Sequence, residues 1–321
     1  MQLLPTLLTQ EYEAEYEVIV VDMCDSRNTK DMLEPFEDTY PHLHHTFCPP
    51  TARDISLQRL ALSLGAKAAN FEWIIFLSPA AHITPAWLAH LAPYCDETAD
   101  AVLGTLCYEP GGGPLGKRIR FEHLWEQMTW LPYALRHTPY RTHSGCLCYR
   151  RSYFLSHLGF ASSELLAIGA ETLLVNHHVT KGRCHVALDP SSIVRLPLPT
   201  YYTWHRDQLY EMETAQHLRH ALLPKMDGIL QAVTFPIFTV SAITAAVLYI
   251  ELPQIAAIMA VLWLILTVTE AATFSYNCRQ IGIPTPSVSL PWLLLLLPFW
   301  SVSTWLRWLF TPKSLFRKKF V

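Results

Sequence analysis

Blocks of apolar and polar residues over residues 1–225 follow the order expected of an α/β domain. Residues 16–22 (YEVIVVD) and 73–77 (WIIFL) are short apolar runs rich in β-branched and aromatic residues, and they predict buried strands. Residues 3–8 and 55–69 place apolar side chains at helical spacing. Because helices and strands alternate, we predict a mostly parallel, Rossmann-like sheet.

The same pattern predicts further elements along this part of the chain. Residues 31–36 can start a helix, and residues 101–107 form another short strand. Thr84 and Pro85 are typical of a helix N-terminus, with Thr84 as the N-cap and Pro85 in the first turn. Residues 111–116 are rich in glycine but lack the Lys-Ser/Thr pair of a phosphate-binding loop, so we interpret them as a connector.

Two long uncharged runs change the picture after residue 225. Residues 228–250 and 252–269 contain no charged side chain. As a helix, the first run is about 34 Å long, which is enough to cross a hydrocarbon core of roughly 30 Å. A turn at residues 251–253 joins the runs, so they predict a transmembrane helical hairpin.

Residues 288–310 form a third apolar segment, whose placement is harder to predict. Pro291 and Pro298 interrupt it, and its tryptophans and Arg307 are typical of the headgroup zone of a bilayer. A full third span would carry the basic residues 317–319 out of the cytosol, against the positive-inside rule. We therefore prefer a re-entrant or interfacial segment, with a third span as the alternative.

Composition and charge fit this division of the chain. Apolar residues make up 51% of the 321 residues, charged residues make up 16%, and no acidic residue follows Glu270. We expect a cytosolic domain over residues 1–225, a transmembrane hairpin over 226–275, and a membrane-associated segment over 276–321. The net charge of −3 and the lack of a basic–aromatic stripe argue against a nucleic-acid partner.

The N-terminal residues and the cysteines both favour a domain that is not secreted. The first residues lack the cationic and long apolar regions of a signal peptide, so we expect none. The eight cysteines do not have the spacing of a disulfide framework. We therefore expect reduced thiols in a cytosolic domain.

Several segments, taken in order, resemble family 2 glycosyltransferases. They are LLPTLLTQEYEAEYEVIVVD, TARDISLQRLALSLGAKAANFEWIIF, HSGCLCYRRSYFLSHLGF, GAETLLVN and the TWHRDQ segment before the hairpin. The resemblance rests on their order and looks closest to the membrane-anchored members common in Bacteroidetes. It implies a GT-A fold and inverting transfer of a sugar from a nucleotide sugar.

The resemblance places the donor site at the ends of the two predicted strands. Asp22 is the position that would hydrogen-bond the uracil or ribose. Ser78 and Ala80 stand where the family has an Asp-x-Asp motif that contacts the ribose and holds Mg²⁺ or Mn²⁺. Serine, proline and alanine offer no carboxylate, and the nearby His82 is a poor substitute, so we expect no metal ligand here.

The resemblance also implies a base and a diphosphate-binding element. Inverting transfer needs a group that takes the proton of the acceptor hydroxyl. The family's acidic pair corresponds to Ala170 and Glu171, so Glu171 is the candidate base, with a solvated glutamate at a helix start as the alternative. Of the Gln-x-x-Arg-Trp element only Gln208 is retained, and Glu211 replaces the arginine that grips the diphosphate.

Two further segments have implied roles. Ser144 and Gly145 correspond to the loop that lines the acceptor side, and Arg150 or Arg151 could face a phosphate, although both are more often surface residues. Family members begin with a strand of the type VSVVI, and this sequence starts after that point. Either the start codon is misplaced or this first strand is absent, and its loss would leave unpaired sheet edges and remove one wall of the nucleotide pocket.

Two functional hypotheses remain. The first is a glycosyltransferase in the inner membrane, with its N-terminal domain in the cytosol, that acts on a lipid-linked or polymeric envelope glycan. The alternative is a catalytically inactive relative that serves as a binding or scaffold subunit of an envelope-glycan assembly. The missing metal carboxylates and Glu211 favour the alternative, while the order of segments favours the enzyme.

Overall fold

The computed structural model describes residues 3–23, 27–49, 56–143, 145–157, 159–160, 169–219, 221–247, 253–283 and 289–316. Three features of the sequence interpretation lie outside these ranges: Ser144, the turn at residues 251–252, and the basic residues 317–319.

Short strands form the centre of the N-terminal domain. They are β1 (Val18–Asp22), β2 (Leu43–Phe47), β3 (Trp73–Leu77), β4 (Ala101–Leu103), β5 (Leu106–Tyr108), β6 (Cys146–Arg150), β7 (Cys184–Val186) and β8 (Val194–Leu196). The single strand predicted over residues 101–107 is therefore wrong, because Gly104 separates β4 from β5. A Cβ atom on Gly104 would lie 2.3 Å from the Cys146 sulfur, so the chain turns where only glycine fits.

Helices cover this sheet system. They are α1 (Leu3–Leu8), α2 (Arg27–Thr39), α3 (Leu57–Ala68), α4 (Trp87–Leu91), α5 (Gly113–Leu135), α6 (Arg151–Ser156), α7 (Ala170–His178) and α8 (Tyr201–Gln216). Thr84 does not cap α4, since the helix begins later and the Thr84 hydroxyl donates to the Ser191 carbonyl over 3.5 Å. The glycine-rich connector is shorter than predicted, because α5 already begins at Gly113.

The sheet is mixed rather than mostly parallel. A four-stranded sheet has the order β3-β6-β4-β7, in which β6 is antiparallel to β3 and β4 and β7 is parallel to β4. Two smaller parallel pairs, β1-β2 and β5-β8, complete the system. The sequence pattern predicted β1 and β3, but apolar runs do not encode the direction in which strands pair.

The outer edges of β1 and β3 have no paired strand among the described residues. The register of β1 on β2 directs the backbone groups of Val18, Val20 and Asp22 to β2, so those of Ile19 and Val21 point to the other edge. β3 pairs only with β6.

The β1-β2 pair is joined to the four-stranded sheet through contacts next to β1 and β3. The Glu17 carboxylate, just before β1, accepts hydrogen bonds from the Asn70 amide at 2.6 Å and from its side chain at 2.8 Å, just before β3. On one face, Ile19 of β1 and Ile74 of β3 pack into the same core as Ala66 of α3. The starts of β1 and β3 therefore lie close together over a shared helix.

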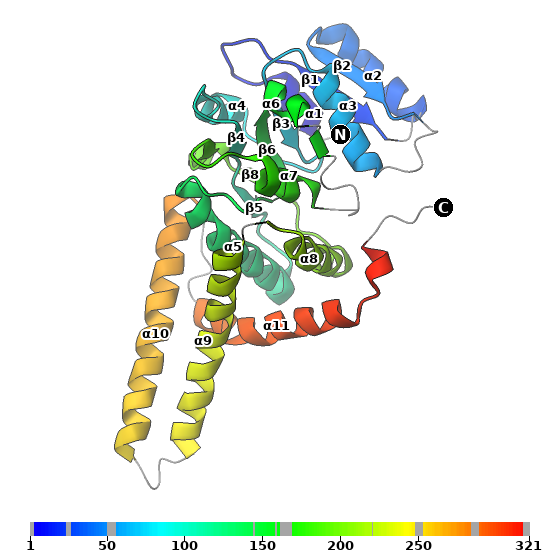
Figure 1. Cartoon of the computed structure of the whole chain (residues 1–321). Coiled ribbons are helices and arrows are strands. Elements are labelled where there is room, and N and C mark those ends of the chain that lie inside the picture. The colour runs from blue at the N-terminus through cyan, green and yellow to red at the C-terminus, as the bar shows by residue number, and fades with distance from the viewer. Residues whose placement is uncertain are drawn as a thin grey trace.

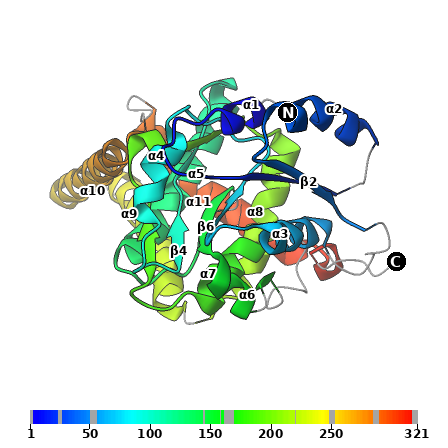
Figure 2. The same cartoon turned by 90° about the horizontal axis from the view of Figure 1, so that it is seen from above.

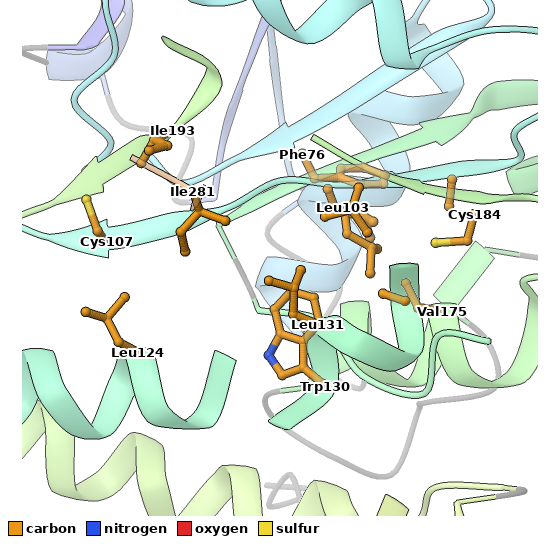
Figure 3. Close-up of a cluster of buried hydrophobic side chains, with 14 of the residues drawn as sticks. Phe76, Leu103, Cys107, Leu124, Trp130, Leu131, Val175, Cys184, Ile193 and Ile281 are labelled. Atoms are coloured by element: carbon orange, nitrogen blue, oxygen red, sulfur yellow. The ribbon is translucent and has the colours of Figure 1, made fainter. Parts of the chain in front are cut away.

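The main hydrophobic core lies between the four-stranded sheet and helices α5 and α7 (Figure 3). Phe76 and Leu103 from the sheet meet Trp130 of α5 and Val175 of α7 in this cluster. Ile281, far along the chain, packs into the same core. The C-terminal part of the chain thus shares its core with the N-terminal domain.

Three long helices make up the C-terminal part: α9 (Leu222–Val247), α10 (Pro253–Gln280) and α11 (Leu290–Phe310). α9 and α10 lie side by side and extend away from the domain as a hairpin (Figure 1). α11 runs across the base of the domain and contacts α8 and α9 (Figure 1). Among the described residues, α10 and α11 are long and apolar enough to cross a membrane, judged by length and composition alone.

Candidate functional site

The ends of β1 and β3 place three of the predicted donor-site residues. Asp22 is the last residue of β1 and is half-buried. Ser78 directly follows β3, and its amide donates to the Gly145 carbonyl over 3.0 Å. The Ser78 hydroxyl accepts from the Ala80 amide at 3.4 Å, so the residues after β3 form a tight turn with Ala80 exposed. Because the Ser78 and Ala80 amides are bonded within the protein and Pro79 has no N–H, the turn offers the Ser78 hydroxyl to a ligand.

Gly145 lies directly against this turn. Its φ of +140° is rare for residues with a side chain, and an added Cβ would lie 3.4 Å from Leu106 and 3.7 Å from Ser78. The resemblance assigned Gly145 to the acceptor-side loop, and the structure brings it into contact with the predicted donor loop. These two segments therefore form one continuous surface.

The residues after β3 do not fit a divalent metal ion. Ser78, Pro79 and Ala80 carry no carboxylate, and no group of three or more His, Cys, Asp or Glu side chains in the described part of the chain is arranged to hold a metal. The acidic residue in contact with this loop is Glu109, whose carboxylate lies 2.6 Å from His82 Nδ1. One paired carboxylate cannot supply the oxygen ligands that Mg²⁺ or Mn²⁺ requires.

Glu171 lies in the first turn of α7 and is only 6% exposed. The start of α7 packs tightly on α8, since a Cβ on the cap residue Gly169 would lie 2.3 Å from the Thr214 hydroxyl. The Thr172 hydroxyl donates to the Thr142 carbonyl over 2.6 Å. Glu171 is thus not the solvated glutamate of the alternative interpretation, because three segments enclose it.

Arg141 forms a charged cluster with carboxylates from two helices. Its guanidinium pairs with Glu126 of α5 and, over 2.7 Å, with Glu211 of α8. All three side chains are largely shielded, with exposures of 16%, 30% and 20%. Burial raises the pKa of Glu211 to about 7; Arg141 opposes this shift, and the charges of Glu126 and Glu171 add to it. The candidate base and Glu211 therefore belong to one electrostatic cluster.

Gln208 lies one turn before Glu211 on α8. Its amide group donates to the Glu122 carboxylate of α5 over 2.5 Å, and its carbonyl oxygen lies 3.5 Å from the Thr304 hydroxyl of α11. Burial raises the pKa of Glu122, against the hydrogen bonds from Arg118 and Gln208. In this structure Gln208 links α8 to its neighbours, and its predicted role toward a nucleotide stays a prediction.

Neither Arg150 nor Arg151 is oriented toward the predicted donor site. Arg150 donates to the carbonyls of Ala99 and Asp96, and Arg151 donates to the carbonyl of Ala66. A cavity of about 580 Å³ lies beside Arg150, at the end of β6 opposite Gly145. Both arginines hold neighbouring segments in place, and a role of either toward a phosphate stays a prediction.

Sequence reasoning missed Arg141 and Glu126. Arg141 lies in a polar segment without any motif, and its partner Glu211 is 70 positions away. Glu126 lies in α5, a helix that the sequence interpretation did not recognise. The one available signal was Glu211 itself, since a glutamate in place of an expected arginine calls for a cationic partner in the fold.

Comparisons with known proteins agree with this architecture. Residues 2–156, just under half of the chain, match the family model described as "Glycosyl transferase family 2". The match covers β1, β3 and the turn with Ser78 and Ala80, and it ends before Glu171 and Gln208. Among curated proteins, none matches this chain.

Comparison with solved structures gives matches of different strength. The mannosyltransferase PcManGT from Pyrobaculum calidifontis, in complex with GDP-Man and Mn²⁺, has a TM-score of 0.52 at 18% identity, covering 96% of this chain and 82% of that one. Residues 1–349 of S. aureus TarS give a TM-score of 0.43 at 18% identity, covering 63% of this chain and 58% of that one. The chain thus spans less than two thirds of the TarS fragment. Similarity to PcManGT shows a GT-A-like fold.

Proposed function

We propose that this protein is a membrane-bound glycosyltransferase. It moves a sugar from a nucleotide sugar to a lipid-linked or polymeric glycan, with inversion at the anomeric carbon. Support comes from the family 2 match over residues 2–156 and from the fold shared with a mannosyltransferase. The observation that carries the proposal is the buried carboxylate of Glu171, which the start of α7 holds beside the Arg141 cluster.

Glu171 is the base in this mechanism. In a single displacement the acceptor hydroxyl attacks the anomeric carbon and loses its proton as the bond to the diphosphate breaks. A carboxylate that is largely withdrawn from water, yet placed at a helix start, is suited to receive that proton. The nucleoside diphosphate leaves with the electrons of the broken bond.

Asp22 and the Ser78–Ala80 turn receive the nucleotide part of the donor. Asp22 binds the base or ribose through its carboxylate, and the turn presents the Ser78 hydroxyl. Because this turn has no carboxylate, donor binding does not depend on a divalent metal ion. The donor-site residues and Gln208 are assigned by position in the chain and in the fold.

The hairpin of α9 and α10 anchors the protein in the inner membrane, with the N-terminal domain in the cytosol. Exposed apolar side chains support this placement along both helices; they include Leu230, Ile237, Val240, Ile243, Ile258, Val261, Leu264, Ile265 and Val268. In water such a surface would favour aggregation, whereas lipid tails cover it at no cost.

Titration of the purified protein with nucleotide sugars tests the proposal. We expect UDP- or GDP-sugars to bind in the micromolar range by calorimetry, with the same affinity in EDTA and in Mn²⁺. Absence of binding with every donor would contradict the enzyme and support the inactive scaffold protein. Binding that requires Mn²⁺ would contradict the metal-independent donor site.

A further inference from the structure

α11 has two faces with different surroundings. It is as apolar as α10 and contains Arg307 as its charged residue. Unlike α10, it does not extend away from the domain: in Figure 1 it runs across the hairpin direction, and from above it lies behind the sheet domain (Figure 2). A helix in that position cannot run alongside α9 and α10 through the same bilayer.

The inner face of α11 is fixed to the domain at its start. Leu290, Leu293 and Leu294 are buried and belong to the main core, together with Ile281. The turn after α10 is also tightly packed, because a Cβ on Gly282 would lie 2.5 Å from Pro190. The first turns of α11 therefore have no freedom to leave the domain without opening its core.

The middle of the inner face is held by a stacked guanidinium. Arg118 of α5 lies 4.3 Å from the ring centre of Trp300 on α11 and 4.8 Å from that of Trp204 on α8. Its Nε donates to Glu122 over 2.8 Å. One arginine thus joins α5, α8 and α11 through a cation–aromatic stack that favours their association.

The end of the inner face is tied to the site helix α8. Glu213 accepts a hydrogen bond from Trp308 Nε1 over 2.9 Å and pairs with Lys313 over 3.0 Å. The Tyr210 hydroxyl donates to the Leu315 carbonyl over 3.0 Å. Glu213 and Tyr210 flank Glu211 on α8, so the end of α11 is fixed next to the charged cluster.

The outer face of α11 is a continuous exposed apolar stripe. Its members recur every three to four residues along the helix, as one face of a helix requires. They are Trp292 (70% exposed), Leu296 (42%), Phe299 (64%), Val302 (55%), Leu306 (42%), Leu309 (49%) and Phe310 (80%). No charged residue interrupts this stripe, and it continues the exposed apolar surface of the hairpin.

We propose that α11 lies in the plane of the bilayer surface, with this stripe in the lipid and its inner face packed against α8. Lipid fits better than a protein partner because the stripe is long and uncharged, and because tryptophans and cations, including Arg307 and Lys313, accompany it. These contacts between α11 and α8 hold α8, with Gln208 and Glu211, at the membrane surface. On the proposed function, the site therefore takes acceptors that are presented at that surface.

Depth measurements in nanodiscs distinguish an in-plane helix from a spanning one. Nitroxide side chains would be incorporated one at a time at Trp292 and Leu306, both in the stripe of α11, and at Ile255 and Thr269 of α10 as the matched pair. All four positions are exposed, so a label there leaves the core intact. The two positions of each pair are separated by the same number of residues, about 20 Å along a helix.

We expect the two α11 labels at the same shallow depth and the two α10 labels at depths that differ by about 20 Å, from power saturation with oxygen and a nickel chelate. α11 labels that differ by about 20 Å would overturn the proposal in favour of a third span. Labels that report only water, or spin–spin coupling between two copies at Trp292, would overturn it in favour of a solvent-exposed or dimer-covered face. No outcome depends on sugar transfer, so failure here is separate from failure of the proposed function.

Discussion

At the candidate site one guanidinium forms ion pairs with carboxylates from two helices. Arg141 pairs with Glu126 and Glu211, and Glu171 adds its charge to the same cluster. The sequence showed Glu211 as a charge reversal, which on its own favours an inactive protein. The structure shows that the reversal is compensated, because Arg141 supplies the cation from a different segment. Pairing over such a sequence distance follows from the fold and could not be deduced from the sequence.

The raised pKa of Glu211 predicts a pH dependence of stability. Between pH 4.5 and 7 the unfolded chain has lost the Glu211 proton while the folded chain retains it, so folding binds a proton and stability falls as pH rises through this window. Glu211→Gln removes this contribution. We expect the variant to gain stability relative to wild type from pH 4.5 to 7 and the difference to stay constant above pH 7, measured by thermal unfolding in detergent.

Glu97→Gln is the matched control, because Glu97 lies on the exposed surface beside the cavity at the other end of the sheet. It should show no such pH-dependent difference from wild type. A Glu211→Gln variant whose difference from wild type is flat from pH 4.5 to 7 would contradict the burial of that carboxyl group.

Two glycines test how tightly α7 is seated on α8. Gly169 and Gly182 have nearly the same backbone conformation, with φ of +91° and +88°, but only Gly169 faces a neighbour, the Thr214 side chain. Gly182→Ala should destabilise the protein by about 1–2 kcal/mol through backbone strain alone. Gly169→Ala should cost about 1–3 kcal/mol more, since the new methyl group overlaps Thr214.

Chemical denaturation of both variants measures this difference. Equal losses for Gly169→Ala and Gly182→Ala would show that α7 does not press against α8, and the enclosure of Glu171 would then be wrong.

At the scale of elements, strands β1 and β3 followed directly from their apolar runs, and the helix at residues 55–69 was predicted close to α3. The mixed direction of the sheet did not follow, because pairing depends on long-range connections that a local pattern does not contain. The division of residues 101–107 into two strands could not be predicted either. Gly104 is required there because of its close contact with Cys146, which only the fold reveals.

The unpaired edges of β1 and β3 predict a pattern of amide exchange. Register directs Ile19 and Val21 of β1, and Trp73 and Ile75 of β3, away from their paired strands. We expect these amides to exchange with solvent at least ten-fold faster than those of the alternate residues, which are bonded within the sheet, such as Val20. Residue-resolved hydrogen exchange measures this directly. Uniform protection along both strands would mean that these edges are paired.

At the scale of the whole molecule, the sequence predicted a polar domain followed by a separate membrane segment. The division at residues 225 and 275 stays a prediction, but the structure adds that the parts share one core. Ile281 and Leu290 pack among the buried residues of the sheet domain. Sequence alone could not distinguish these positions, because a lipid-facing residue and a core residue have the same apolar character.

The shared core and the contacts of α11 with α8 join the long C-terminal helices to the candidate site as one unit. The account therefore predicts that sugar transfer occurs at a bilayer, uses Glu171, and does not require the metal ion that the turn after β3 cannot hold.

Release of nucleoside diphosphate from UDP- and GDP-sugars, measured in nanodiscs that contain glycolipid acceptors, tests this claim most directly. We predict turnover that is unchanged by EDTA and falls by about 10²–10⁴-fold in Glu171→Gln, as expected for loss of a general base, while Glu97→Gln retains it. Full turnover in Glu171→Gln, or none from any donor in the wild-type protein, would contradict the account.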